Sequence, residues 1–328
     1  MSGTGARSSP AMANGLPVFS AQTRLLVVAP HPDDETIATG LLIQQVRAAG
    51  GEVRILLLTE GDNNPWPQRW LERRVRIRVA DRQRWGDRRH AEMLQALQCL
   101  GVPAQALQPL GWPDMGVTDE LLQSFGASVP ALAAAIGQFA PSLVVAPALA
   151  DRHPDHGAAH VLVRLALAEL ANPPPLLNYL VHGRDGDGDS FVIHGTAAQS
   201  ACKRAALTAH RSQMALSGKR MLRLAARPER HGGLASPLDA LPWRPPVWLR
   251  PWLQLTVASP AGTQSWRWRD APLRRDQAGR LYLPVPAGSP CFARLALTMR
   301  SPWIFDHWGW CELSNHSGGG AAGLAPAD

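Results

Sequence analysis

Residues Leu25–Ala29 form a short apolar run, and a histidine and three carboxylates follow it in the sequence Pro30-His-Pro-Asp-Asp-Glu35. A run of this length is typical of a fully buried strand in a parallel sheet. An amphipathic segment comes next, with apolar residues at helical spacing, and it ends at Gly50-Gly51. The polar cluster is therefore predicted at the carboxyl end of a strand, where ligands bind in open α/β sheets.

The same order of strand, polar turn and helix occurs a second time. Ser142–Pro147 is predicted to be a buried strand, and Asp151-Arg-His-Pro-Asp-His156 follows it. A helix is predicted from Ala158 to Leu170. The two polar turns are thus expected at the ends of adjacent strands.

Acidic residues in the first turn of a helix are also explained by the helix macrodipole, and that explanation stays open for Asp34 or Glu35 alone. It does not account for His31 or for the two prolines that fix the backbone of this turn. A histidine and an aspartate three positions apart can project from one turn onto one metal ion. Asp33 then lies between them, where it can meet a bound water.

Together the two turns resemble the P-H-P-D-D-E (more often A-H-P-D-D-E) and H-P-D-H motifs of the LmbE-like, or PIG-L, family of zinc-dependent N-acetylglucosamine deacetylases. The segments Arg89-His-Ala-Glu92, Gly111-Trp-Pro-Asp114 and Lys203–Gln213 are similar to further segments of that family. The resemblance covers about residues 22–215. It implies an α/β fold with a Rossmann-like, mainly parallel sheet and helices on both of its faces.

The resemblance also implies one zinc ion per chain, with His31, Asp34 and His156 as its ligands. Three protein ligands and one open position for water are typical of a catalytic zinc site. The same donors would also accept iron or cobalt. Zinc lowers the pKa of water to about 7, and Asp33 is expected to accept the proton of that water as general base.

Two further residues are expected to act in catalysis. His153 is expected to stabilise the oxyanion formed on an acetamide or to protonate the departing amine, and Asp155 to hold His153 in its charged form. By resemblance, Arg89 and Asp114 border the substrate. Arg89 also belongs to an ordinary helical i, i+3 pair, and Asp114 to an ordinary turn, so the structural explanations stay open for both.

The predicted function is hydrolysis of an N-acyl group, in the simplest case N-acetyl, on a substrate that contains an amino sugar. Two alternatives stay open. One is an amidase of the same fold that acts on a thiol conjugate or an antibiotic-like amide, and the other is a non-catalytic protein that binds carbohydrates or anions. The first turn lacks G-x-G-x-x-G, which argues against a nicotinamide cofactor.

The formal net charge of +7 favours anionic partners, so the predicted substrate class includes N-acylated amino sugars joined to a nucleotide or a lipid. No recognised nucleic-acid-binding motif occurs, and no nucleic-acid partner is expected. No segment offers the ~18 apolar residues of a membrane span, whereas peripheral membrane contact stays open. Four cysteines without a C-x-x-C pair indicate a reduced, cytoplasmic protein. The oligomeric state is left open.

Changes in composition along the chain predict five regions. They are a disordered lead-in at 1–20, the deacetylase domain at 21–216, a linker rich in Pro, Arg and Gly at 217–250, a small β-rich Trp/Arg module at 251–313, and a disordered tail at 314–328.

Two segments leave a choice between packing and binding. The insert 65–89 carries nine arginines with interleaved tryptophans, and it is explained either as a solvated face or as the rim of an anionic-substrate site. Helices are expected after it, from about Asp87 to Leu100 and from about Thr118 to Phe139. In Ser265–Arg269 the alternation of Trp and Arg predicts a strand with tryptophans on one face and arginines on the other.

Overall fold

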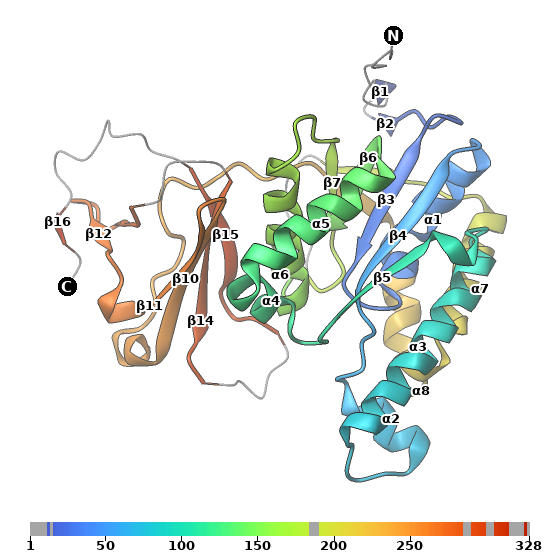
Figure 1. Ribbon diagram of the computed structural model, residues 1–328, viewed down its shortest axis with the longest axis horizontal. Coiled ribbons are helices and arrows are strands. Elements are labelled where there is room, and N and C mark those ends of the chain that lie inside the picture. Colours follow the sequence, from blue (N-terminus) through green and yellow to red (C-terminus); the bar gives the residue numbers. More distant parts are fainter. Residues whose placement is uncertain are drawn as a thin grey trace. The chain divides into compact units, whose positions relative to one another are not determined.

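The computed structural model describes residues 12–13, 16–183, 190–284, 290–299, 305–314 and 325–326 (Figure 1). The chain forms two compact units. The first unit comprises Met1–Val117, Ala135–Pro147 and Pro174–Leu234. The second comprises Thr118–Ala134, Ala148–Pro173 and Ala235–Asp328.

A seven-stranded sheet organises the first unit, with the strand order β5-β4-β3-β6-β7-β9-β8. The first five strands in this order are parallel to their neighbours, and β9 is antiparallel to both β7 and β8. This confirms the predicted mainly parallel sheet. The strands are β3 (Arg24–Ala29), β4 (Glu52–Thr59), β5 (Leu107–Trp112), β6 (Leu143–Pro147), β7 (Leu176–Tyr179), β8 (Ser190–Ile193) and β9 (Glu229–Gly232).

Among the described residues, five complete helices lie in the first unit, and four of them contribute to one continuous core with the sheet. On β3, Leu25 and Val27 enter this core, while the intervening Leu26 and Val28 are also buried on the opposite side. Burial on both faces explains the nearly uninterrupted apolar run of this strand. The helices are α1 (Asp34–Ala48), α2 (Pro65–Glu72), α3 (Val79–Cys99), α7 (Ala197–Ala209) and α8 (Arg211–Ala225).

The second unit contains a four-stranded antiparallel sheet with the order β11-β10-β14-β15. Its apolar face forms a separate core that includes Trp243 and Trp268, so the predicted β-rich module is confirmed and these tryptophans stabilise it by burial. The strands are β10 (Leu253–Ser259), β11 (Gly262–Arg267), β14 (Cys291–Leu297) and β15 (Gly309–Leu313).

Helix α6 (Pro154–Ala168), which begins with the second polar turn, packs against β15 in this unit. Arg164 donates two hydrogen bonds of 2.7 Å to the carboxylate of Glu312. Gly157 lies against Trp310, because an added Cβ would come within 2.8 Å of the indole. The sequence therefore needs glycine at position 157 for helix α6 to approach this sheet closely.

Two of the remaining elements are helices that divide a segment expected to be a single helix. The predicted helix from Thr118 to Phe139 is interrupted at Ser124, which separates α4 from α5. The elements are α4 (Val117–Gln123), α5 (Phe125–Phe139), β1 (Met12–Ala13), β2 (Leu16–Pro17), β12 (Arg274–Arg275), β13 (Leu281–Tyr282) and β16 (Ala325–Pro326).

The structure differs from the sequence expectations in three other segments. The expected linker 217–250 includes the end of α8 and strand β9, which pairs within the main sheet. The helix expected from Asp87 begins at Val79. Strand β11 ends at Arg267, and Trp268 begins a 3-10 turn, so Ser265–Arg269 is not one strand as predicted. The two tryptophans nevertheless pack in the core of the module, while the two arginines are exposed.

Most of the predicted lead-in 1–20 and tail 314–328 lies outside the described residues. In the described part of the chain, no helix is both long enough and apolar enough to cross a membrane.

Candidate active site

The turn between β3 and α1 holds Asp33 in an unusual backbone conformation. Its φ of 115° lies in the region that favours glycine. Three backbone hydrogen bonds maintain it: the carbonyl oxygen of Asp33 accepts from Thr36 (3.1 Å) and Ile37 (2.9 Å), and its N–H donates to the Glu35 carboxylate (3.0 Å). A strained residue of this kind persists where its surroundings over-determine it, which is common at functional sites.

His31 and Asp34, two predicted metal ligands, lie together in this turn. The backbone N–H of His31 donates to Asp34 Oδ2 (2.9 Å), and the same oxygen lies 3.3 Å from His31 Nδ1. The other ring nitrogen, Nε2, lies 3.3 Å from Asp114 Oδ1. All three side chains are buried. Asp114, which was expected to border the substrate, thus contacts a predicted ligand directly.

Arg89 connects this turn to the loop that follows β4. Its guanidinium donates to the carbonyl oxygens of Gly61 (2.5 Å) and Pro32 (2.6 Å), and it lies 3.5 Å from Asp33 Oδ2. In the same loop the backbone N–H of Asn63 donates to Asp114 (2.6 Å). Arg89 therefore stabilises the conformation of the turn and also places a positive charge beside Asp33.

The carboxylates of this cluster differ in how easily they ionise. Burial raises the pKa of Asp33 to about 6, and the positive charge of Arg89 opposes this effect. Burial also acts to raise the pKa of Asp114, but the hydrogen bond and charge of His31 outweigh it and hold that pKa below its ordinary value. Two neighbouring carboxyl groups are thus separated in acidity by their surroundings.

Glu35 and His210 form a buried contact beside the turn, and no role was predicted for either residue from the sequence. His210 Nε2, at the start of α8, lies 3.3 Å from Glu35 Oε1, and both side chains are fully buried. Burial lowers the pKa of His210, but the hydrogen bond and charge of Glu35 outweigh this effect and raise it. The signal in the sequence was the acidic residue that ends P-H-P-D-D-E and the histidine of Lys203–Gln213.

The second polar turn, between β6 and α6, is held by its own residues. His153 is the N-cap of α6, and its Nδ1 accepts from the backbone N–H of Asp155 (3.3 Å). The backbone N–H of His153 donates to Asp151 Oδ1 (2.9 Å). Asp151 Oδ2 lies 3.1 Å from His156 Nδ1, so this carboxylate fixes the orientation of the buried ring.

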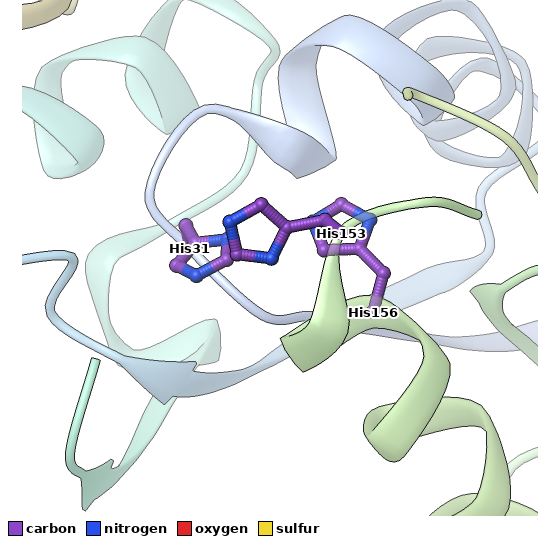
Figure 2. Close-up of side chains that lie close together, drawn as sticks. All are labelled: His31, His153 and His156. Atoms are coloured by element: carbon purple, nitrogen blue, oxygen red, sulfur yellow. The ribbon is translucent and has the colours of Figure 1, made fainter. Parts of the chain in front are cut away.

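His31, His153 and His156 form one group of side chains whose donor atoms all lie within 4.8 Å of one another (Figure 2). Two overlapping groups meet the same criterion, one of Asp34, His156 and His182 and one of His31, Asp114 and Asp155. Imidazole nitrogens with carboxylate oxygens are the donors of hydrolytic zinc sites, so the chemistry of these residues fits such an ion.

The three predicted ligands are divided between these groups, since His31 and Asp34 each occur with His156 but not in the same group. The assignment of ligands therefore stays a prediction. His182, Asp151 and Asp114 are the additional polar groups that the structure places beside them. His182 follows the end of β7, and this position at the end of a parallel strand was its only signal in the sequence.

Residues 26–167 match the family model described as PIG-L, GlcNAc-PI de-N-acetylase. This region belongs to the PIG-L family. The region includes both polar turns and the strands that precede them. The predicted resemblance to this family is thereby confirmed for residues 26–167.

Relatives of the PIG-L region include enzymes named 1D-myo-inositol 2-acetamido-2-deoxy-alpha-D-glucopyranoside deacetylase. The protein from Mycobacterium sp. (strain KMS) is 32% identical over 182 residues, which are 52% of this chain and 58% of that one. The protein from Mycolicibacterium smegmatis is 34% identical over 157 residues, or 44% of this chain and 53% of that one. The chain thus spans little more than half the length of these relatives.

Two solved structures share the fold of the PIG-L region. The A40926 pseudoaglycone deacetylase Dbv21 has a TM-score of 0.52 at 20% identity, covering 65% of this chain and 97% of that chain. The zinc-inhibited form of teicoplanin deacetylase Orf2 has a TM-score of 0.50 at 18% identity, covering 62% and 90%. At these identities the likeness concerns the fold.

Proposed function

We propose that the protein is a metal-dependent deacetylase that hydrolyses the N-acetyl group of an amino-sugar substrate. The observation that carries the proposal is the set of imidazole and carboxylate donors that the two polar turns supply to one small region. The names of the relatives support the substrate class, since they contain a 2-acetamido sugar.

In this proposal His31, Asp34 and His156 hold one divalent ion, and zinc is the first candidate because its hydrolytic sites use this donor set. When bound there, zinc supplies Lewis-acid chemistry, since it polarises a carbonyl group and lowers the pKa of water. Asp151 fixes the ring of His156 through its 3.1 Å contact with Nδ1. Such a partner keeps the tautomer that presents Nε2 to a metal.

Asp33 is proposed as the general base. Its side chain is 15% exposed, so a water molecule can reach it, while burial raises its pKa to about 6. At neutral pH the carboxylate is ionised and yet basic enough to accept a proton from the attacking water. Arg89 lies 3.5 Å from this carboxylate, and its positive charge favours the ionised form.

His153 is proposed to donate a hydrogen bond from Nε2 to the oxyanion that forms on the acetamide. Because Nδ1 accepts from the backbone N–H of Asp155, the ring proton resides on Nε2 in this geometry. Asp155 then positions His153 through its backbone N–H, and the expected role of its carboxylate in charging the ring stays a prediction. The leaving amine would receive its proton from Asp33, which took one from water.

The substrate range is tested by offering the zinc-loaded protein a panel of N-acetylated amino sugars, inositol glycosides, nucleotide sugars and lipid-linked sugars. Mass spectrometry should detect products lighter by one acetyl group from at least one amino-sugar class. The Asp33→Asn variant is the matched control and should leave the panel unchanged. Turnover of antibiotic-like amides or thiol conjugates alone would replace the amino-sugar assignment, and no turnover of any amide would overturn the proposed reaction.

A further inference from the structure

Helix α2 and the segment after it expose large apolar side chains to solvent. Trp66 and Trp70 are 63% and 67% exposed, and Val75 and Val79 are 85% and 84% exposed. These residues lie within residues 65–84, which we call the Trp/Arg corner. Large side chains of this kind rarely gather on a surface unless it contacts a partner or a membrane.

The exposed tryptophans are held in place by the opposite side of α2. Pro67 and Gln68 are buried, and Gln68 Nε2 donates to the carbonyl oxygen of Asp81 (2.6 Å). The helix also packs against α8. Trp66 and Trp70 are four residues apart, so they share one face of α2. Their exposure is a feature of a fixed helix and is not the result of a frayed end.

The Trp/Arg corner is strongly basic. It contains seven arginines and two carboxylates. Both carboxylates already have partners: Glu72 pairs with Arg84 (2.6 Å), and Asp81 pairs with Arg74 (2.7 Å) and Arg84 (3.1 Å). In the part of the chain that the structure describes, Arg73 and Arg76 form no ion pair. The surface therefore carries uncompensated positive charge beside its apolar side chains.

We propose that the Trp/Arg corner docks on the surface of an anionic lipid bilayer. Tryptophan rings are suited to the level of the headgroups, and arginines pair with lipid phosphates. A single-stranded nucleic acid would also contact tryptophan and arginine, but it gives no role to the exposed Val75 and Val79. These side chains gain by insertion among acyl chains. A two-fold interface between two copies would place like-charged arginine clusters face to face.

The corner is firmly connected to the sheet edge that carries His31. It follows β4 directly, and the intervening loop is bonded to Arg89 through Gly61 and to Asp114 through Asn63. Figure 1 shows α2 at the lower end of the view, past the ends of β3 and β4. Docking would therefore orient this edge toward lipid, whatever reaction the site performs.

Co-sedimentation of the full-length protein with lipid vesicles tests the proposal. Vesicles of phosphatidylcholine with about one third phosphatidylglycerol should bind the protein at least about tenfold more strongly than pure phosphatidylcholine at about 0.1 M salt. Trp66→Ser with Trp70→Ser should lower this partitioning at least about tenfold. Arg73→Gln and Arg76→Gln should each lower it about fivefold.

Matched controls come from the second unit. Trp248→Ser changes a tryptophan that is 73% exposed, and Arg275→Gln changes an exposed arginine of β12. Both should leave partitioning unchanged. An unchanged melting temperature of the Trp66/Trp70 variant should accompany its loss of binding, since both side chains face solvent.

Four outcomes would overturn the proposal. They are equal binding to neutral and anionic vesicles, full binding by the Trp66/Trp70 variant, an equal loss with Trp248→Ser, and tryptophan-dependent binding of single-stranded polynucleotide without vesicle binding. Light scattering adds a fifth, an oligomer that dissociates when Trp66 and Trp70 are replaced, because a second copy would then cover the corner. None of these measurements depends on deacetylase activity.

Discussion

The two polar turns supply similar side chains, but they are stabilised in different ways. The turn after β3 places Asp33 at a φ of 115° and relies on residues far away in the sequence, since Arg89 and His210 lie on α3 and at the start of α8. In the turn after β6, His153 caps its own helix and Pro154 occupies the first helical position. Both of these are standard local signals for the start of a helix.

This difference suggests a division of roles. A strained backbone that distant residues maintain can hold one carboxylate in a position that a relaxed turn would not provide. A locally capped turn is suited to present imidazole rings as donors. The strained conformation of the first turn is therefore expected to determine the rate of proton transfer by Asp33. The support that Asp151 gives to His156 in the second turn is expected to raise the affinity for the metal, to which His31 and Asp34 also contribute.

The largest effect is expected from the predicted ligands in both turns. His31→Ala and His156→Ala should each remove stoichiometric zinc and lower kcat/KM by at least about 10³-fold, because the Lewis acid is lost with its donors. Metal analysis of the purified variants measures occupancy directly. His90→Ala, on the neighbouring helix α3 and paired with Glu60, is the matched control and should retain zinc. Full occupancy in His156→Ala would exclude the proposed ligand set.

Asp33→Asn should give the next largest effect and should separate rate from affinity. General bases contribute about 10²–10⁴-fold to a rate, so kcat should fall by that factor while zinc occupancy stays complete. The amide keeps the size of the side chain but cannot accept the proton. A loss below about tenfold at saturating zinc would show that another group is the base.

Glu35→Gln and Asp151→Asn test the comparison most directly, since each changes one supporting carboxylate. Asp151→Asn should weaken zinc binding about 10–100-fold, as substitution of the partner of a metal-ligating histidine does. Glu35→Gln should lower kcat about tenfold with little change in zinc affinity, because it perturbs the conformation of Asp33. Competition with a metal chelator measures the affinities. Equal loss of zinc in both variants would contradict the division of roles.

The pH profile should report the environment of Asp33. Only its ionised form can act as base, so kcat/KM should fall as the pH decreases through about 6, the value to which burial raises the pKa of Asp33. Arg89 lowers this pKa, so Arg89→Gln should move the acid limb to higher pH. Arg88→Gln, one residue away and paired with Glu92, should leave the limb in place. A shift to lower pH in Arg89→Gln would contradict the assignment.

The smallest effect on activity is expected where the second turn continues into α6. In Gly157→Ala the new Cβ would lie 2.8 Å from Trp310, and the overpacking should destabilise the fold by about 1–3 kcal/mol. Gly126→Ala, in α5, meets nothing within 4 Å and should stabilise the fold by up to about 1 kcal/mol. Thermal unfolding measures both. Equal melting temperatures would show that α6 adjusts its position beside β15.

The parts of the fold that were predictable from the sequence are those with local signals. The buried runs 25–29 and 142–147, followed by polar turns, indicated parallel strands with a site at their ends, and β3 and β6 confirm those strands. Alternating residues near the carboxyl end of the chain indicated the β-rich module, whose strands pair with neighbours close in sequence. Periodicity and turn residues are enough to predict such elements.

Long-range contacts decided the rest. Strand β9 is short and lies in a Pro-, Arg- and Gly-rich segment, so only its pairing with β7 and β8 identifies it as part of the main sheet. Burial of Glu229 in that strand is possible because Lys203 and the backbone N–H groups of Leu41 and Leu42 bind its carboxylate.

Long-range contacts also decided those features of the candidate site that could not be predicted from the sequence. His31, Asp33 and His156 could be chosen as candidates from the sequence because strand ends and helix starts have local patterns, and the family resemblance supplied their expected roles. The sequence did not indicate the positive φ of Asp33 or the contact between Glu35 and His210. A strained conformation and a buried ion pair have no local signature, since both exist only when distant parts of the chain enclose them.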